Sequence, residues 1–255
     1  MRHSKSTQHQ VQLWSVSFDL VDGDRAQALV RVLVESERRQ YDALKVPAQQ
    51  QQYLVAHALL RMALSRICPM RPSAWQFEKD RFGKPFIRFP RPTSDICFNL
   101  SHTSGLVACV TSRCGDVGID VEKADCRADL ETMARHCLSD MELARWRQET
   151  TTQRCLSFYE LWTLKEALMK GLGLGLSLRP SEVSFEAQSG SPESSPAWFL
   201  TTTGLGKWSF HVFTPTAEHV GAIAVRTVRL ARSQVSWHYL RCEDVVQELS
   251  RMSGG

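Results

Sequence analysis

The sequence has 255 residues, 43% of them hydrophobic, which is enough to bury the core of one large domain or two modest ones. Its formal net charge of +4 at pH 7 suits a polyanionic ligand or an acidic partner, and long basic runs of the kind found in nucleic-acid-binding arms are absent from it. No apolar stretch approaches the roughly 18 residues that a membrane span requires, so we expect neither nucleic acid nor a membrane as a partner.

None of the eight cysteines stands in a C-x-x-C pair, which argues against a zinc site or a thioredoxin-type redox site. The first ten residues are polar and lack the apolar centre of a signal peptide. We therefore expect a reduced, cytoplasmic compartment, in which most cysteines are small core residues.

In the first half of the chain, apolar periodicity predicts a strand, two helices, a hairpin and a further strand. Their ranges are 10–18 for the strand, 28–45 and 49–68 for the helices, 75–89 for the hairpin, and 96–112 for a loop followed by a strand.

The second half repeats this order. We expect a strand at 116–123, helices at 129–149 and 154–170, a glycine-rich helix end at 171–176, a surface loop at 187–196, and strands at 208–215 and 219–228. The repetition favours an α+β fold with two similar halves, residues 11–112 and 115–230, joined near residues 112–115.

The first candidate site is the Asp120-Val121-Glu122 triplet in the strand at 116–123. Alternate residues of a strand share a face, so the two carboxylates point together, about 7 Å apart along the strand. Such a pair can hold a hard divalent cation through its oxygens. Taken alone, the triplet is more typical of a solvated acidic edge strand.

The second candidate lies on the helix at 154–170, where Trp162, Glu166 and Lys170 recur every four residues and form one stripe. A carboxylate and an ammonium group one turn apart can be part of a site. They can also be an ordinary helical ion pair.

The third candidate combines Arg81-Phe82-Gly83-Lys84-Pro85 with Asn99-Leu100-Ser101-His102. A lysine in a Gly/Pro turn and a histidine beside a serine can bind phosphate oxygens through side chains and backbone N–H groups. Each segment alone is more typical of a turn or of a capping pair.

In order and spacing, these segments resemble the 4′-phosphopantetheinyl transferase superfamily, specifically its Sfp-type branch. The pattern is Arg-x-Gly-Lys-Pro, Asn-x-Ser-His, Gly-Ile-Asp-x-Glu and Trp-x-x-Lys-Glu-x-x-x-Lys, and its strongest part runs from Arg81 to Leu176. The resemblance implies a pseudo-dimer of two α+β subdomains, with coenzyme A and Mg²⁺ in the cleft between them.

By this resemblance, the metal ligands are Asp120, Glu122 and Glu166. The residues that contact coenzyme A are Arg61, Arg81, Gly83, Lys84, Pro85, Ser101, His102, Lys165 and Lys170. Within that set, Lys165 and Lys170 resemble the basic pair near the pyrophosphate, His102 the contact to the 3′-phosphate, and Ser101 a positioning residue.

One position departs from the family pattern. Sfp-type proteins often carry a basic residue about nine positions before Arg61, where this chain has Gln52. Arg38, Arg39, Lys45 or His57 are the alternatives that could supply the positive charge to the 3′-phosphate.

The implied reaction is the transfer of phosphopantetheine from coenzyme A to a serine of an apo acyl or peptidyl carrier protein, with release of adenosine 3′,5′-bisphosphate. The serine hydroxyl needs a base, for which we expect Glu166, directly or through a metal-bound water. Lys170 would neutralise charge on the leaving phosphate.

Because carrier proteins of this kind are generally acidic, their docking surface is expected to be basic. The candidates on and near the helix after the metal strand are Arg127, Met133, Arg135, Arg145 and Arg147. The same arginines could instead only keep that helix soluble. Since both halves lie in one chain, we expect a monomer.

Two other functions are compatible with parts of this pattern. A Mg²⁺-dependent phosphodiesterase or nuclease also uses carboxylates and lysines, but the nuclease pattern would place a lysine where this chain has Ala124. A non-catalytic basic binding module would show a long basic stripe with interleaved aromatic residues if its ligand were nucleic acid, and this sequence lacks one.

Overall fold

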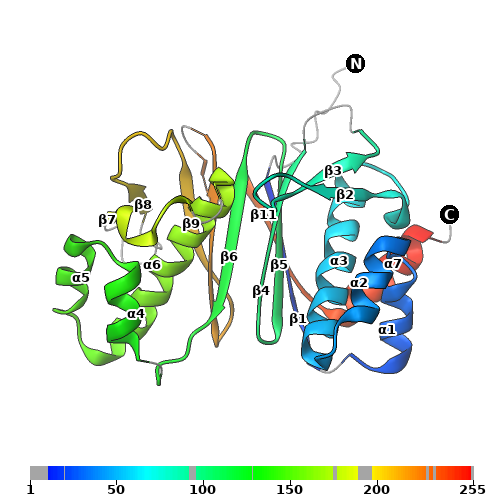
Figure 1. The fold of residues 1–255 in the computed structure, drawn as a ribbon, viewed down its shortest axis with the longest axis horizontal. Coiled ribbons are helices and arrows are strands. Elements are labelled where there is room, and N and C mark those ends of the chain that lie inside the picture. The colour runs from blue at the N-terminus through cyan, green and yellow to red at the C-terminus, as the bar shows by residue number, and fades with distance from the viewer. Residues whose placement is uncertain are drawn as a thin grey trace, which may run out of the picture.

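The structure is a computed structural model that describes residues 11–19, 21–91, 96–127, 129–174, 177–188, 197–227, 230–231 and 234–253. Its helices and strands build the expected α+β fold (Figure 1). No helix in these ranges is both long enough and apolar enough to cross a membrane.

The first sheet has the strand order β11-β1-β5-β4. Its strands are β1 (Val11–Ser17), β4 (Cys97–Thr103), β5 (Leu106–Ser112) and β11 (Val235–Arg241). Neighbouring strands are antiparallel, except that β11 runs parallel to β1.

One face of this sheet is covered by the long helix α3 (Pro47–Ile67). Around α3 lie α1 (Gly23–Val30), α2 (Glu35–Ala43) and α7 (Cys242–Ser253). The short hairpin of β2 (Gln76–Lys79) and β3 (Pro85–Phe89) extends beside α3 towards the middle of the molecule (Figure 1).

The second sheet has the order β6-β10-β9, formed by β6 (Val117–Lys123), β9 (Ser209–Thr216) and β10 (His219–Val225). Helix α6 (Thr151–Leu172) packs on it, with α4 (Leu130–Cys137), α5 (Asp140–Trp146) and a hairpin of β7 (Phe185–Gln188) and β8 (Ala197–Leu200) beyond.

The inner faces of the two sheets pack on each other through residues such as Leu13 and Val110 on one side and Ile119 and Ile223 on the other. The layers therefore follow the order helix, sheet, sheet, helix (Figure 1). Strands β4 and β6 lie side by side where the sheets meet, so segments from both halves of the chain are in contact there.

Several predicted elements differ from the structure. The helix expected over 28–45 is divided into α1 and α2, because the Glu37 carboxylate accepts a hydrogen bond from Val34 N and starts a new helix there. The helix expected over 129–149 is likewise α4 and α5, divided where Ser139 and Glu142 form a capping box.

The region 96–112 is the hairpin of β4 and β5, and not a loop followed by a strand. Most of the loop expected at 187–196 lies outside the described residues. The final segment, for which no structure was predicted, supplies β11 and α7, and both pack with the first half of the chain.

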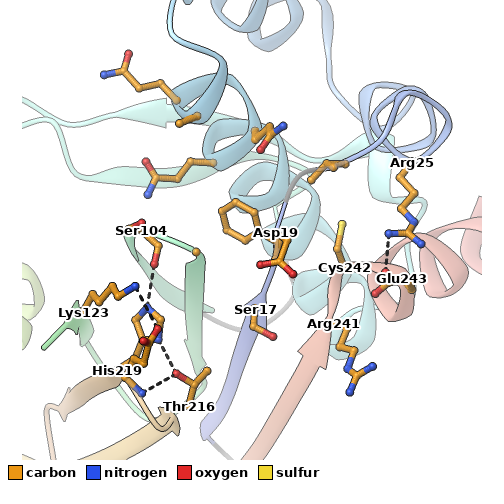
Figure 2. A pocket seen from close by; sticks show the side chains of 18 of the residues that line it. Ser17, Asp19, Arg25, Ser104, Lys123, Thr216, His219, Arg241, Cys242 and Glu243 are labelled. Carbon is orange, nitrogen blue, oxygen red and sulfur yellow. Dashed lines mark hydrogen bonds and ion pairs between the residues drawn. The ribbon is translucent and has the colours of Figure 1, made fainter.

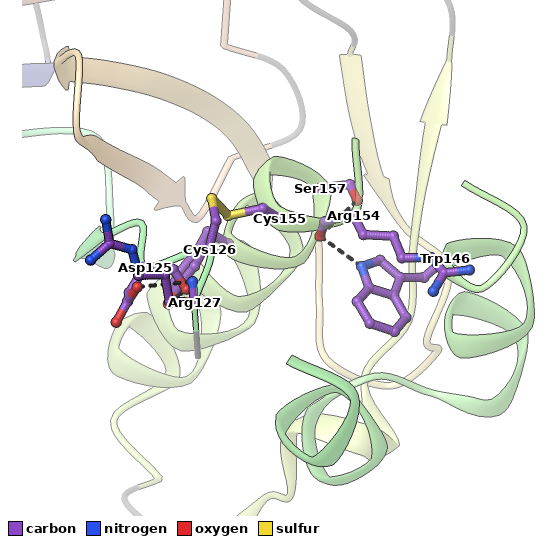
Figure 3. Close-up of a disulfide and its surroundings, with 8 residues drawn as sticks. Asp125, Cys126, Arg127, Trp146, Arg154, Cys155 and Ser157 are labelled. Atoms are coloured by element: carbon purple, nitrogen blue, oxygen red, sulfur yellow. Dashed lines mark hydrogen bonds between the residues drawn. A yellow bond between two sulfur atoms is a disulfide. The ribbon is translucent and has the colours of Figure 1, made fainter. Parts of the chain in front are cut away.

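The cysteines only partly follow the expectation of free core thiols. Cys109, Cys137 and Cys242 are free and buried, whereas Cys126 and Cys155 form a disulfide. This bond joins the loop after β6 to the beginning of α6 (Figure 3). It therefore connects the strand that bears Asp120 and Glu122 with the helix that bears Glu166.

Helix α6 approaches β6 very closely at Gly118. A Cβ atom added there would lie 1.9 Å from the carbonyl oxygen of Ala167 and 2.5 Å from the nitrogen of Gly171. Because both are backbone atoms, no side-chain rotation could relieve the overlap. The absence of a side chain at Gly118 thus sets the distance between helix and strand.

Gly118→Ala should therefore force α6 away from β6 and lower the free energy of unfolding by about 3 kcal/mol, at the upper end for overpacked cores. The measurement is urea denaturation followed by circular dichroism. Gly23→Ala is the matched control, since an added Cβ there meets nothing within 4 Å; its change should stay within about 0.5 kcal/mol. Equal midpoints for the two variants would contradict the tight helix–strand contact.

Candidate active site

Asp120 is the centre of the candidate site. It lies on the face of β6 that is turned to α6, and its side chain is only 4% exposed. Its Oδ1 atom accepts hydrogen bonds from Lys170 Nζ at 2.6 Å and from Ser101 Oγ at 2.9 Å. Lys170 Nζ also lies 3.0 Å from Ser101 Oγ. Each of the three groups therefore contacts the other two, and together they connect β4, β6 and α6.

Two further carboxylates border Asp120. Burial and the negative charge of Asp120 raise the pKa of Glu122 to about 7, with a smaller contribution from Glu166. The pKa of Glu166 is also raised, by burial and then by Asp120. The structure thus brings the three predicted acids into mutual electrostatic range, together with Lys170.

The donor atoms at this place fit a hard divalent cation. Asp120 Oδ2 is buried and has no hydrogen-bond partner among the described residues, which is unusual for a carboxylate oxygen. Oxygen ligands are those that Mg²⁺ prefers, and a cation would relieve the repulsion that raises the two glutamate pKa values. In the described part of the chain, however, no group of three or more His, Cys, Asp or Glu side chains forms a ready-made metal cluster.

The turn of the β2–β3 hairpin brings Lys84 to the end of α6, near Lys170. Gly83 has a positive φ of 85°, and Asp80 Oδ1 accepts hydrogen bonds from Phe82 N at 2.8 Å and Lys84 N at 2.9 Å, which shapes the turn. Lys84 Nζ then donates to the carbonyl oxygen of Gly171 at 2.9 Å, next to Lys170.

The neighbours of Lys84 complete the hairpin. Pro85 begins β3, and the Arg81 guanidinium lies over the Phe82 ring at 4.7 Å from its centroid.

His102 follows Ser101 on β4. Partial desolvation and the charge of Lys170 lower its pKa, which favours the neutral imidazole at pH 7. Its exposed side chain lies, by strand alternation, on the face of β4 opposite to Ser101, within electrostatic range of Lys170 and Asp120.

The structure places Lys165 apart from the contact of Asp120 with Lys170. Its ammonium group is fully buried on another face of α6, where it pairs with Glu142 Oε2 at 2.6 Å and donates to the carbonyl oxygens of Pro180 at 3.0 Å and Val183 at 2.5 Å. Burial is the main cause of its lowered pKa.

Arg61 is also buried, with partners other than Asp120 and Lys170. Its guanidinium donates to the carbonyl oxygens of Pro72 at 2.7 Å and Trp75 at 2.8 Å, and it pairs with Glu37 at 2.6 Å. His57 binds the other oxygen of Glu37 at 3.0 Å. This cluster connects α2 with α3.

Gln52 does point towards β4: its Nε2 donates to the carbonyl oxygen of Thr103 at 3.0 Å. The alternative cations for the 3′-phosphate do not gather there. Arg38 reaches the carbonyl oxygen of Val30, and Arg39 pairs with Glu35 at 3.7 Å.

Sequence reasoning missed a row of polar contacts between β4 and β6. Three β4 side chains accept hydrogen bonds from β6 backbone nitrogens: Asn99 from Ile119 at 3.0 Å, Ser101 from Val121 at 3.3 Å, and Thr103 from Lys123 at 3.3 Å. The available signal was the alternation of polar residues in Asn99-Leu100-Ser101-His102-Thr103, which is typical of a strand.

A hollow of about 1100 Å³ opens at the end of β4 and β6 (Figure 2). Lys123, which follows Glu122 but points to the opposite face of β6, lines it together with Gln52 and Ser104. There Lys123 pairs with Glu218 at 3.1 Å, and Arg25 pairs with Glu243 at 2.6 Å. These cations are matched by acids, as Lys170 is by Asp120, whereas Lys84 Nζ binds a backbone carbonyl oxygen.

The chain is similar in sequence to known 4′-phosphopantetheinyl transferases. The family model described as "4′-phosphopantetheinyl transferase superfamily" matches residues 116–224. The chain is 26% identical to 4′-phosphopantetheinyl transferase HetI of Nostoc sp. over 193 residues, which cover 75% of this chain and 81% of HetI.

It is also 32% identical to 4′-phosphopantetheinyl transferase Sfp of Bacillus subtilis over 125 residues, which cover 49% of this chain and 53% of Sfp. The second alignment thus spans only about half of that relative. Among solved structures, the holo-acyl-carrier-protein synthase AcpS of Thermotoga maritima matches with a TM-score of 0.35 and 23% identity over 45% of this chain and 64% of AcpS.

The raised pKa of Glu122 leads to a prediction for stability. Since its pKa in the folded protein lies above the usual 4.5, the protonated form stabilises the fold below about pH 4.5, and this contribution is lost as pH rises through about 7. Glu122→Gln should therefore raise the free energy of unfolding at pH 8 by about 2 kcal/mol and change it little at pH 4, measured by urea denaturation without divalent cations.

Adding MgCl₂ at pH 8 should raise the melting temperature of the wild-type protein and have a smaller effect on Glu122→Gln. A variant that is less stable than wild type at pH 8 would contradict the repulsion between the carboxylates.

Proposed function

We propose, because the family model matches residues 116–224 and the relatives it resembles are 4′-phosphopantetheinyl transferases, that this chain transfers the 4′-phosphopantetheine group of coenzyme A to a serine of an apo acyl or peptidyl carrier protein. The observation that supports this most directly is the contact of Asp120 with Lys170 and Ser101, since it unites three of the family-like motifs at one point.

In this proposal, coenzyme A lies in the crevice between the two halves. Lys84 and Lys170 meet at the end of α6 and provide positive charge for its phosphates, with Ser101 and His102 of β4 beside them. Asp120, Glu122 and Glu166 would hold Mg²⁺, which when bound neutralises charge on the pyrophosphate as the bond to the leaving group breaks.

The chain's own residues then account for the transfer. The oxygen of the carrier serine attacks the phosphorus that bears the pantetheine arm, and the bond from that phosphorus to the adenosine 3′,5′-bisphosphate oxygen breaks. Glu166 accepts the serine proton, a role to which its raised pKa is suited at neutral pH. Lys170 Nζ, one turn further along α6, stabilises the negative charge on the departing phosphate.

In this scheme, Lys165 and Arg61 act indirectly, by holding elements of the fold in place. Lys165 holds α6 to α5 and to the segment 180–183 through Glu142 and two backbone carbonyls, and Arg61 holds α2 and the segment 72–75 against α3. Both support the walls of the crevice and need not touch coenzyme A.

For the carrier, an acidic partner on the side of α4 and α5 agrees with the net charge of +4. Arg135 and Arg147 both pair with Glu131, and Arg145 donates to the carbonyl oxygen of Phe185 at 3.3 Å. Among the expected docking residues, we therefore favour Arg127, which lies in the loop that follows Cys126 (Figure 3).

We further propose a monomer, since β4 and β6 bring both walls of the crevice from one chain. A cytoplasmic location is also proposed; the Cys126–Cys155 disulfide argues against it, because disulfides are rare in reducing compartments.

Incubation of the protein with coenzyme A, MgCl₂ and an apo carrier protein tests the function. Mass spectrometry should show that the carrier gains one phosphopantetheine group, and that adenosine 3′,5′-bisphosphate is released in equal amount. A panel of fatty-acid, polyketide and nonribosomal-peptide carriers would identify the acceptor. Hydrolysis of coenzyme A or of nucleic acid, with no change in any carrier, would instead indicate a phosphodiesterase or nuclease.

Glu166→Gln tests the proposed base. Coenzyme A binding, measured by calorimetry, should remain within about tenfold of wild type, whereas transfer should fall at least about 100-fold. Glu160→Gln provides a control on the same helix, because Glu160 is partly buried and its pKa is raised by burial and by Glu149, away from the acidic group. Wild-type turnover in Glu166→Gln would rule out Glu166 as the base.

A further inference from the structure

Strands β4 and β6 are held together in an unusual way. Each is the last strand of its own sheet, and β4 belongs to the first half of the chain and β6 to the second. The three bonds between them described above run from β6 backbone nitrogens to side-chain oxygens of Asn99, Ser101 and Thr103. We call this row of contacts the seam.

The spacing of the seam matches the spacing of the acids. Its acceptors occur at every second residue of β4 and its donors, Ile119, Val121 and Lys123, at every second residue of β6. The bonded nitrogens therefore lie on both sides of Asp120 and on both sides of Glu122. Each acid is fixed at the peptide groups that flank it, and its own side chain also reaches β4: Asp120 Oδ1 accepts a hydrogen bond from Ser101 Oγ, and Glu122 Oε2 lies 3.5 Å from Thr103 Oγ1.

Ser101 differs from the other two seam residues because its hydroxyl also touches Asp120 and Lys170. Asn99 is buried and its Oδ1 is used by Ile119 N at 3.0 Å. Thr103 Oγ1 lies 3.3 Å from Lys123 N and 3.5 Å from Glu122 Oε2. Asn99 is thus too enclosed to touch a substrate, and Thr103 faces β6 at the level of Glu122.

We propose that Asn99 and Thr103 are positioning residues, which set the register of β4 on β6 and thereby the separation of the Asp120 and Glu122 carboxylates. Their effect on activity depends on the proposed transferase function, whereas their effect on divalent-cation binding does not. Removing a residue that orients a metal ligand, without itself touching the metal, typically lowers metal affinity or activity about 10- to 100-fold. We expect a loss in this range here.

A side-chain seam has a physical consequence that a backbone ladder lacks. A ladder is formed by the backbone of any residue except proline, so substitutions leave it largely intact. In the seam, a single side chain supplies each acceptor, and its loss leaves a β6 N–H without a partner. Sub-ångström shifts of β6 would then move both carboxylates together.

Thr103→Val removes the hydroxyl but keeps the size and β-branched shape of threonine. Calorimetric titration with MnCl₂ should show about tenfold weaker binding than wild type, and kcat for phosphopantetheine transfer should fall about tenfold while KM for coenzyme A stays within about twofold. Thr103→Ser restores the acceptor and should recover both values to within about threefold.

Thr111→Val is the matched control. Thr111 is buried on β5, next to β4, and its hydroxyl donates to the carbonyl oxygen of Gln12 at 3.5 Å. The chemical change is the same, but it lies within the first sheet and not in the seam. Metal affinity and kcat of Thr111→Val should match wild type. Comparing the melting temperatures of Thr103→Val and Thr111→Val separates the effect of the seam from the loss of stability that follows the removal of any buried hydroxyl.

Asn99→Ala provides an independent variant at the other end of the seam, and the same losses are expected. Wild-type metal affinity and kcat in both Thr103→Val and Asn99→Ala would overturn the proposal, as would equal losses in Thr111→Val. If the wild-type protein binds Mn²⁺ but transfers no phosphopantetheine, the proposed function fails and the titrations still decide the role of the seam. A wild-type protein that does neither overturns both.

Discussion

The contact of Asp120 with Lys170 and Ser101 is the constraint on which the site depends. A carboxylate that is almost fully buried needs a positive partner and hydrogen-bond donors, because desolvation of an isolated charge costs several kcal/mol. Here the ammonium comes from α6 and the hydroxyl from β4, so satisfying one buried charge ties together a helix of the second half and a strand of the first.

Close backbone approach makes the contact possible. Gly118 allows α6 to touch β6, and the helix then presents Glu166 and Lys170 to the strand that carries Asp120. The seam supplies the complementary restraint from β4. The acids are therefore held from two sides by contacts that would be disturbed by small changes in side-chain size or polarity, as is typical of sites that need accurate geometry.

Buried cations elsewhere serve a different purpose. Lys165 and Arg61 are each enclosed with one glutamate and two backbone carbonyls, so their charges are neutralised inside the walls of the crevice. Breaking either pair would leave an uncompensated buried charge, which explains why such residues are sensitive to substitution even where they touch no ligand. Sensitivity to mutation alone would not distinguish them from Lys84 and Lys170.

The sequence by itself determined the features that depend on local periodicity. Strand alternation placed Asp120 and Glu122 on one face, helical spacing placed Glu166 and Lys170 on one stripe, and Gly83 indicated the turn that presents Lys84. Only the tertiary structure decided that Lys170 faces the acids while Lys165 is buried, and that Arg61 lies in the core. It also decided that β11 returns to the first sheet and that β4 and β6 meet through side chains. The physical reason is that a residue's periodicity is set by its neighbours in the chain, whereas the partner of a charge or of a strand edge is set by segments that only packing brings near.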